Sequence, residues 1–133
     1  MDYIVIKRFK GQAISGIVNL PYGTELQSKN GFIIHGDLPI CSVRSQNAYD
    51  HFVVNDDGMG LERGRLIQAI IRTLIQKDAL HQERWDKVWN CPRCKKYKRK
   101  EFADHWMWNH EFYNASIADL RHIAKLVGAK ESG

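Results

Sequence analysis

The spacing of hydrophobic and polar positions divides this chain into a β-like first half and a helical second half. Short apolar runs at 3–6, 32–34 and 38–43 are separated by Gly, Pro, Asn and Asp. Runs of this length between turn residues are typical of strands joined by tight connections. They predict a small antiparallel β-sheet or barrel at the N-terminus, and Ser45 is placed to cap a brief helix through Phe52.

The hydrophobic period changes after the segment 55–60, which is rich in Asn, Asp and Gly. This segment lacks the glutamate and the alternating ligands of a calcium loop, so it predicts a turn that leads into a helix. Apolar residues then recur at the spacing of one helix face, which predicts a long central helix from Leu61 to Asn90 with a bend near Asp78. The stripe comprises Leu66, Ile67, Ile70, Ile71, Leu74, Ile75, His81, Trp85, Val88 and Trp89.

The C-terminal part also has helical character, at 101–113 and again from Ser116 onward. Ser116 with Asp119 resembles a capping box, and Gly128 is a natural helix stop. The predicted fold class is therefore α+β, with a small N-terminal sheet, a long central helix and a C-terminal helical part. We expect an α+β core domain at 1–90 and a C-terminal part at 91–133, a division that leaves a single compact unit open.

The composition is that of an ordinary globular protein with a basic surface. Of 133 residues, 44% are hydrophobic and 26% charged, and the formal charge of +5 permits an anionic partner without requiring one. The basic residues concentrate in one run with an interleaved tyrosine, which is most often a solvated face and less often a nucleic-acid contact. This run comprises Lys95, Lys96, Tyr97, Lys98, Arg99 and Lys100.

Cysteine usage and the absence of export signals both favour the cytoplasm. Two of the three cysteines are spaced for metal binding, which leaves Cys41 alone, as is common in a reducing compartment. The first residues carry no signal-peptide pattern, and no stretch approaches the roughly 18 apolar residues of a membrane span. We therefore expect residence in the cytoplasm and no membrane partner.

The strongest chemical motif is the spacing C-x2-C-x10-H-x4-H, formed by Cys91, Cys94, His105 and His110. Two thiolates and two imidazoles are a common tetrahedral ligand set for structural zinc. The gap of ten residues is shorter than the roughly 12 of DNA-reading fingers, which argues against base reading.

The two histidines are the weaker half of this motif. Positions five apart on an ideal helix diverge by about 140°, so both reach one ion only if the helix is distorted or ends between them. The alternative ligands are His122, His81 and Asp104. The alternative without a metal is a pair of buried cysteines, with His105 in the core and His110 on the surface.

Two enzymatic interpretations of the same segment are weaker. A thioredoxin-like role for Cys-x-x-Cys needs a βαβ context that the pattern does not predict. His105, Asn109, His110 and Asn114 are residue types found in small metal-dependent nucleases, but their arrangement departs from that site. Without a convergent acid–base set, we expect no enzymatic activity.

Several stretches resemble small uncharacterised proteins of phages and prophages of Gram-positive bacteria. They lie at 7–11, 55–61, 82–87 and 103–110. The resemblance implies an accessory protein that acts in the host cytoplasm. Such proteins often regulate phage genes or block bacterial defences by binding a host protein or nucleic acid. No functional residue follows from the resemblance.

These observations predict a non-enzymatic phage accessory protein that binds a host or phage macromolecule and contains structural zinc. Inhibition of a bacterial defence system is one such role, and a host protein or nucleoprotein complex is the favoured partner. The alternative is a sequence-tolerant nucleic-acid-binding protein that uses the basic run 95–100. A small metal-dependent nuclease is a third, weaker alternative.

Overall fold

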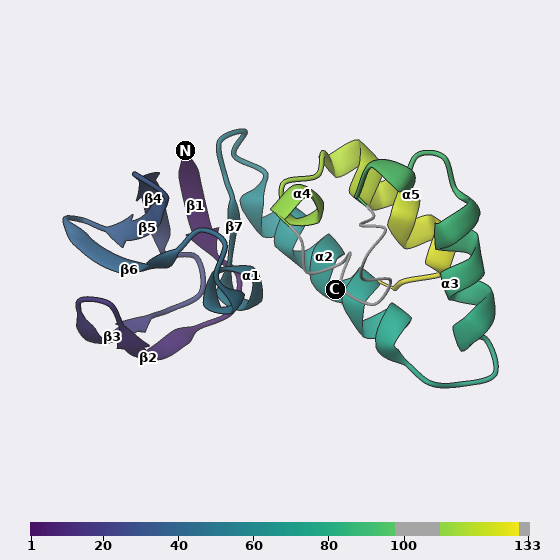
Figure 1. Ribbon diagram of the computed structural model, residues 1–133, viewed down its shortest axis with the longest axis horizontal. Coiled ribbons are helices and arrows are strands. Elements are labelled where there is room, and N and C mark those ends of the chain that lie inside the picture. Colours follow the sequence, from purple (N-terminus) through teal and green to yellow (C-terminus); the bar gives the residue numbers. More distant parts are fainter. Residues whose placement is uncertain (98–109, 131–133) are drawn as a thin grey trace. The chain divides into compact units, whose positions relative to one another are not determined.

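The computed structural model describes residues 1–97 and 110–130, and it confirms the predicted α+β class (Figure 1). The chain divides into two compact units, residues 1–64 and residues 65–133. This division falls inside a helix, whereas the sequence predicted a boundary near Asn90. The first unit contains the strands, and the second contains most of the helices.

The first unit contains the predicted N-terminal antiparallel sheet. Five strands form a sheet of order β6-β5-β4-β1-β7, and β2 pairs with β3 in a separate two-stranded ribbon. All of these pairings are antiparallel. The strands are β1 (Asp2–Val5), β2 (Phe9–Ala13), β3 (Gly16–Leu20), β4 (Glu25–Lys29), β5 (Phe32–His35), β6 (Leu38–Ser42) and β7 (Phe52–Val54).

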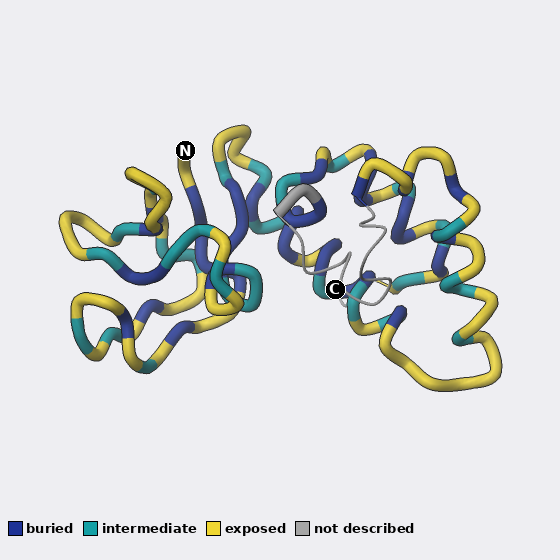
Figure 2. Tube along the Cα trace, viewed as in Figure 1, coloured by how far each residue is buried: buried dark blue, intermediate teal, exposed yellow. Residues whose placement is uncertain are grey.

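The ribbon is tied to the outer edge of the sheet by its own turn. The backbone N–H of Ile14 donates to the carbonyl oxygen of Ile40 at 3.0 Å, and that of Ser15 donates to Pro39 at 3.1 Å. The core between ribbon and sheet draws at least one buried side chain from every strand. Figure 2 shows the buried positions along β1 and β7. Burial of apolar surface from all seven strands is what makes this small sheet stable.

A capped helix precedes the last strand, as predicted. The Ser45 side chain accepts a hydrogen bond from the Ala48 N–H at 3.2 Å and begins α1 (Gln46–His51). The helix ends one residue earlier than predicted, because Phe52 turns extended and begins β7. Phe52 is almost completely buried in the core of the first unit.

The acidic segment 55–60 forms the predicted turn. Its Asp57 carboxylate receives two hydrogen bonds from the Arg63 guanidinium, one of them at 2.7 Å, and Arg63 also donates to the carbonyl oxygen of Val54 at 2.9 Å. The Asn55 side chain accepts from the N–H of Gly60, the first residue of α2 (Gly60–Ile75). Hydrogen bonds from Arg63 and from a backbone N–H lower the pKa of Asp57 to about 2. These polar groups therefore serve the turn and the helix start.

The predicted long central helix is two helices. α2 ends at Ile75 and α3 (His81–Asn90) begins after a loop. Asp78 shapes that loop, since its side chain accepts from the Leu80 N–H at 3.0 Å and binds the Arg84 guanidinium at 2.7 Å. A carboxylate that bonds the backbone locally competes with helical hydrogen bonding, so the predicted bend is a break.

The remaining helices complete the second unit. They are the 3-10 turn η1 (Lys95–Tyr97), α4 (His110–Tyr113) and α5 (Ile117–Val127), and α3 packs against α5. Ser116 caps α5 and Gly128 ends it in the left-handed conformation, as predicted. In the described ranges, none of the helices has both the length and the apolar character that crossing a membrane requires.

The close approach of α2 to the strand region gives a test of the first unit. A Cβ on Gly64 would lie 2.3 Å from Ile6 Cγ2 and 2.8 Å from Ile6 Cβ. We expect Gly64→Ala to lower the free energy of unfolding by about 1–3 kcal/mol, because the clash involves a buried, branched side chain. Urea denaturation measures this. In an Ile6→Ala background the penalty of Gly64→Ala should be smaller, and an equal penalty in both backgrounds would contradict the contact.

Candidate metal centre

The two motif cysteines lie in a tight turn directly after α3. The N–H of Cys94 donates to the carbonyl oxygen of Cys91 at 3.1 Å, and the N–H of Tyr97 donates to Cys94 at 3.0 Å as η1 begins. Cys91 is only 9% exposed, and Cys94 is completely buried. The Cys-x-x-Cys spacing therefore forms a compact knuckle in the structure, with both cysteines buried.

The Cys91 sulfur is surrounded by hydrogen-bond donors. Burial raises the pKa of this thiol, but hydrogen bonds with His122, with the backbone and side chain of Cys94, and with the backbone of Arg93 outweigh it and lower the pKa to about 7. Backbone amides aimed at a sulfur stabilise its thiolate form, which is the form that binds metals. Cys91 is therefore prepared electrostatically as a ligand.

His122 of α5 is the imidazole that the fold brings to this sulfur. Cys91 Sγ and His122 Nε2 are 3.3 Å apart although 31 residues separate them in the chain. Sulfur and nitrogen ligands of one tetrahedral zinc ion lie about 3.5 Å apart, given usual bond lengths of about 2.3 and 2.0 Å. The observed separation is within a few tenths of an ångström of that value. His122 was an alternative ligand on sequence grounds, and it is the one that lies next to a motif cysteine.

The other predicted ligands are placed less favourably or lie outside the described residues. His105, Asp104 and the side chain of His110 fall outside them. His81 begins α3, whose ten residues make it about 15 Å long, so His81 and Cys91 are at opposite ends of this helix. Across residues 1–97 and 110–130, no three His, Cys, Asp or Glu side chains converge as a ready-made metal cluster. Cys91 contacts both Cys94 and His122, but these three side chains are not placed as a preformed metal site.

A buried carboxylate fixes the knuckle to α5. Asp119, only 5% exposed, accepts hydrogen bonds from Arg93 Nε and Lys96 Nζ, each at 2.6 Å, and from the Tyr97 hydroxyl. Burial raises the pKa of Asp119, but bonds from Lys96, Tyr97 and Arg93 outweigh this and hold it well below its usual range. We call Asp119, Arg93, Lys96 and Tyr97 the Asp119 cluster. His122 lies one helical turn after Asp119, so the cluster also positions the imidazole.

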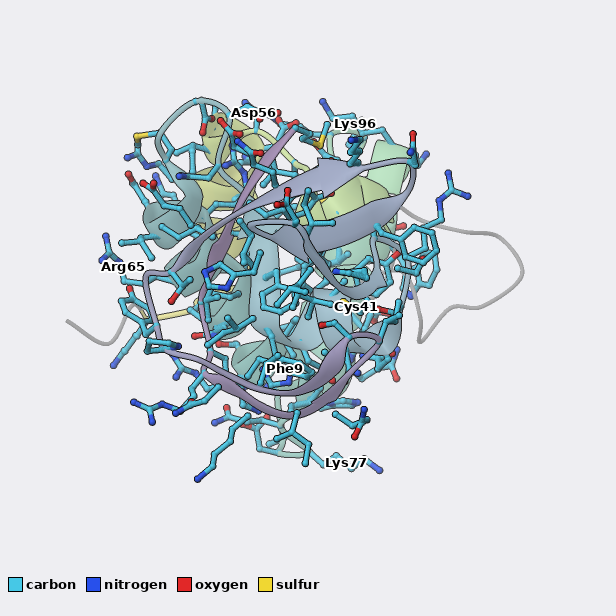
Figure 3. All side chains as sticks on the ribbon, turned by 90° about the vertical axis from the view of Figure 1, so that its left-hand side faces the viewer. Phe9, Cys41, Asp56, Arg65, Lys77 and Lys96 are labelled. Carbon is cyan, nitrogen blue, oxygen red and sulfur yellow. The ribbon has the colours of Figure 1, made fainter. Side chains whose placement is uncertain are left out.

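The described part of the basic run is partly engaged within this cluster. The Lys96 ammonium (labelled in Figure 3) binds Asp119 and lies 5.4 Å from the centre of the Tyr97 ring. Tyr97 is 7% exposed, so its ring is not available for stacking on a base. Burial raises the pKa of the Tyr97 hydroxyl most, and the hydrogen bond to Asp119 raises it further. Lys95 is exposed, and residues 98–100 lie outside the described residues.

Sequence reasoning missed the Asp119 cluster, although a signal was present. Asp119 occupies the buried side of α5 next to Leu120, where an acidic residue needs a partner. The sequence assigned Asp119 to the cap of α5, which by itself accounts for an acidic residue there, and its N–H does donate to Ser116 Oγ at 3.2 Å.

The third cysteine has a different environment. Cys41 (labelled in Figure 3) lies on β6 in the first unit, where burial raises the pKa of its thiol.

Comparison with protein-family models, with curated proteins and with solved structures found no match to this chain. The resemblance to phage proteins therefore stays a prediction, and the function is inferred from the residues of the chain itself.

The Asp119 cluster predicts a specific dependence of stability on pH. Because the folded pKa of Asp119 is below the usual value of about 3.9, its contribution is complete above about pH 4 and is lost as the pH falls through the folded pKa. Asp119→Asn should lower the free energy of unfolding at pH 7 by about 1–2 kcal/mol, since Arg93 and Lys96 are half-exposed and solvent screens them. It should also reduce the loss of stability on acidification.

Chemical denaturation between about pH 7 and pH 2.5 measures both effects. The matched control is Asp86→Asn, which removes the same charge from the exposed side of α3, where Asp86 accepts a hydrogen bond from Gln82. The control should change stability by less than about 0.5 kcal/mol. Equal effects of the two substitutions would contradict a special role for Asp119.

Proposed function

We propose that this protein is a non-enzymatic binding protein whose second unit is held together by a structural zinc ion on Cys91, Cys94 and His122. The observation that carries this proposal is the separation of 3.3 Å between Cys91 Sγ and His122 Nε2, beside a buried Cys94. The sequence predicted His105 and His110 as the two histidine ligands, and their side chains lie outside the described residues. With His122 as one ligand, a tetrahedral ion needs one further ligand, and that either of these histidines supplies it stays a prediction.

Zinc is the metal best suited to these donors. Thiolates and imidazole together are the preferred ligands of zinc, while carboxylate and carbonyl oxygens suit magnesium and calcium. The burial of both cysteines favours a structural site, which a fourth protein ligand would close, over a catalytic one, which keeps a position open to water. Such an ion would join the C-terminal end of α3 to α5, and its binding free energy would add to the stability of the second unit.

The Cys91–His122 contact also fits a nucleophilic thiolate with an adjacent base. The near-complete burial of Cys91 and the second buried sulfur beside it favour the metal site. In addition, two cations of the knuckle segment, Arg93 and Lys96, are bound to Asp119. We therefore infer a staple rather than a reaction centre.

The partner we propose is a macromolecule in the cytoplasm of a bacterial host, either a host protein or a nucleoprotein complex. The resemblance of several stretches to phage proteins supports this, and inhibition of a bacterial defence system is a role that fits. Direct binding of nucleic acid by the run 95–100 is the second candidate. It is supported by the net charge of +5, but the engagement of Lys96 and the burial of Tyr97 weaken it.

Zinc content tests the first part of this proposal. We expect about one zinc ion per chain by elemental analysis of protein purified without chelator. Cys91→Ser and His122→Asn should each reduce zinc content several-fold and lower the melting temperature, because structural zinc contributes folding free energy. His81→Asn, at the far end of α3, is the matched histidine control and should leave the zinc content unchanged.

Thiol labelling gives a second readout of the same site. Iodoacetamide at neutral pH should modify Cys91 slowly in the zinc-loaded protein and quickly after a chelator is added. Rapid labelling of Cys91 without a chelator, in protein that contains no zinc, would instead indicate a reactive nucleophile. Full zinc content in both Cys91→Ser and His122→Asn would contradict the site itself.

Gel-shift titration separates the two kinds of partner. If the partner is a protein, we expect no shift of a 30-base-pair duplex or single strand at about 10 µM protein and about 50 mM salt, where phosphate contacts are strong. If a shift occurs, the triple variant Lys95→Glu, Lys98→Glu, Lys100→Glu should abolish it, and Lys96 is left intact to preserve the Asp119 cluster. Lys7→Glu, Lys10→Glu, Lys29→Glu applies the same charge change in the first unit. A shift lost only in the first variant would establish nucleic-acid binding.

A further inference from the structure

One strand edge in the first unit has no partner. Ala13 and Gly16 flank a two-residue turn, so they form a hydrogen-bonded pair of the β2–β3 ladder. Hydrogen-bonded and non-hydrogen-bonded pairs alternate along an antiparallel ladder, so Ile17 and Asn19 belong to non-hydrogen-bonded pairs. The backbone N–H and C=O groups of Ile17 and Asn19 point away from β2. Within the part of the chain that the structure describes, no backbone or side-chain group bonds to them.

The other edges of this unit are covered or carry a charge. The outer edge of β6 receives hydrogen bonds from Ile14 and Ser15, and the β7 carbonyl of Val54 receives one from Arg63. β2 has an exposed lysine, Lys10, on its solvent face. Natural sheets block unwanted pairing with cover, charge, proline or bulges. β3 contains no charged residue and no proline, and its pairing with β2 shows no bulge.

Apolar side chains accompany this open edge. Ile17 is 83% exposed on the solvent face of the ribbon, and Ile14 in the adjoining turn is 59% exposed. Covering a large apolar side chain that is this exposed removes apolar surface from water, which is favourable in free energy. An uncharged edge with unpaired backbone groups and an exposed isoleucine is well suited to the addition of another strand.

We propose that a second copy of this chain adds to β3 in antiparallel orientation, with a two-fold axis at Val18. In this register Ile17 of each copy faces Asn19 of the other, so their outward backbone groups form four hydrogen bonds. Val18 of one copy then faces Val18 of the other in the closer, non-hydrogen-bonded type of pair, which suits β-branched side chains. The two ribbons become one four-stranded sheet.

The arrangement of charge supports a second copy as the occupant. Across the four strands, each row on the solvent face would read Lys10, Asn19, Ile17 and Gln12, with the last two from the other copy. Each row contains one lysine, so no like charges face each other. The strand is also self-complementary under a two-fold axis, which is the symmetry of most dimers. Because β3 has only five residues, the interface is small, and we expect a dimer with a dissociation constant on the order of 10 µM.

Sedimentation velocity of the full zinc-containing chain, from about 1 µM to about 1 mM, tests this pairing. We expect a monomer–dimer equilibrium for the wild type. Asn19→Pro removes one donor per copy, hence two of the four bonds, and leaves the bonds to β2 intact, so it should weaken dimerisation by about tenfold or more. Ile17→Lys removes the apolar contact and places a second lysine in each row, and it should act in the same direction.

Gln12→Lys is the matched control, because it adds the same charge on β2, one strand further from the axis. It should leave the dimer unchanged, and circular dichroism should show that all three variants fold. A wild-type chain that stays monomeric to 1 mM would overturn the proposal, as would a dimer that both edge variants retain. Capture of a different protein by a monomeric wild type, lost in both variants, would show that β3 binds another chain instead. This pairing is independent of the zinc site, so Cys91→Ser should still dimerise.

Discussion

The second unit depends on the burial of a single carboxylate. Asp119 is buried near the start of α5, and its carboxylate accepts hydrogen bonds from Arg93, Lys96 and Tyr97 of the segment 91–97. A buried carboxylate without partners would be strongly destabilising, so the knuckle has one favourable position on the helix. That position brings Cys91 within 3.3 Å of His122, one turn further along α5. The candidate metal centre is therefore a consequence of how the carboxylate is paired.

Zinc and the Asp119 cluster would reinforce each other. The cluster holds the knuckle on α5 through its hydrogen bonds and ion pairs, which explains how a cysteine and a histidine distant in sequence come to lie side by side. Metal bonds would then hold the same two segments through different atoms. In this arrangement two residues of the basic run are engaged within the unit, since Lys96 binds Asp119 and Tyr97 is buried. A basic residue in such a run therefore need not contact an external anion, because a buried carboxylate of the same chain can bind it.

The first unit uses a related pairing for a different purpose. Arg63 is 4% exposed, and it joins the Asp57 turn to the edge of β7. Arg63 covers part of the outer edge of β7, and the turn of the ribbon covers part of the outer edge of β6. Both edges would otherwise present unpaired backbone groups. Among the strands of the described residues, β3 keeps an uncharged outer edge, and this is where we propose that a further strand is added. Binding through this edge and metal binding in the second unit involve different residues and can be altered separately.

The sequence by itself determined the local features of this protein. The caps at Ser45 and Ser116, the stop at Gly128 and the Cys-x-x-Cys knuckle depend on residues within a few positions of each other, so their patterns could be recognised. The α+β class followed from a change in hydrophobic period. The break at Asp78 was predicted only as a bend, because helical periodicity continues across it. The tertiary structure alone decided three features of the described residues: that His122 lies beside Cys91, that Asp119 binds Lys96 and Tyr97 of the basic run, and that the outer edge of β3 has no partner. Each depends on segments far apart in the chain, whose approach is set by burial and the pairing of buried charge, and neither leaves a local pattern.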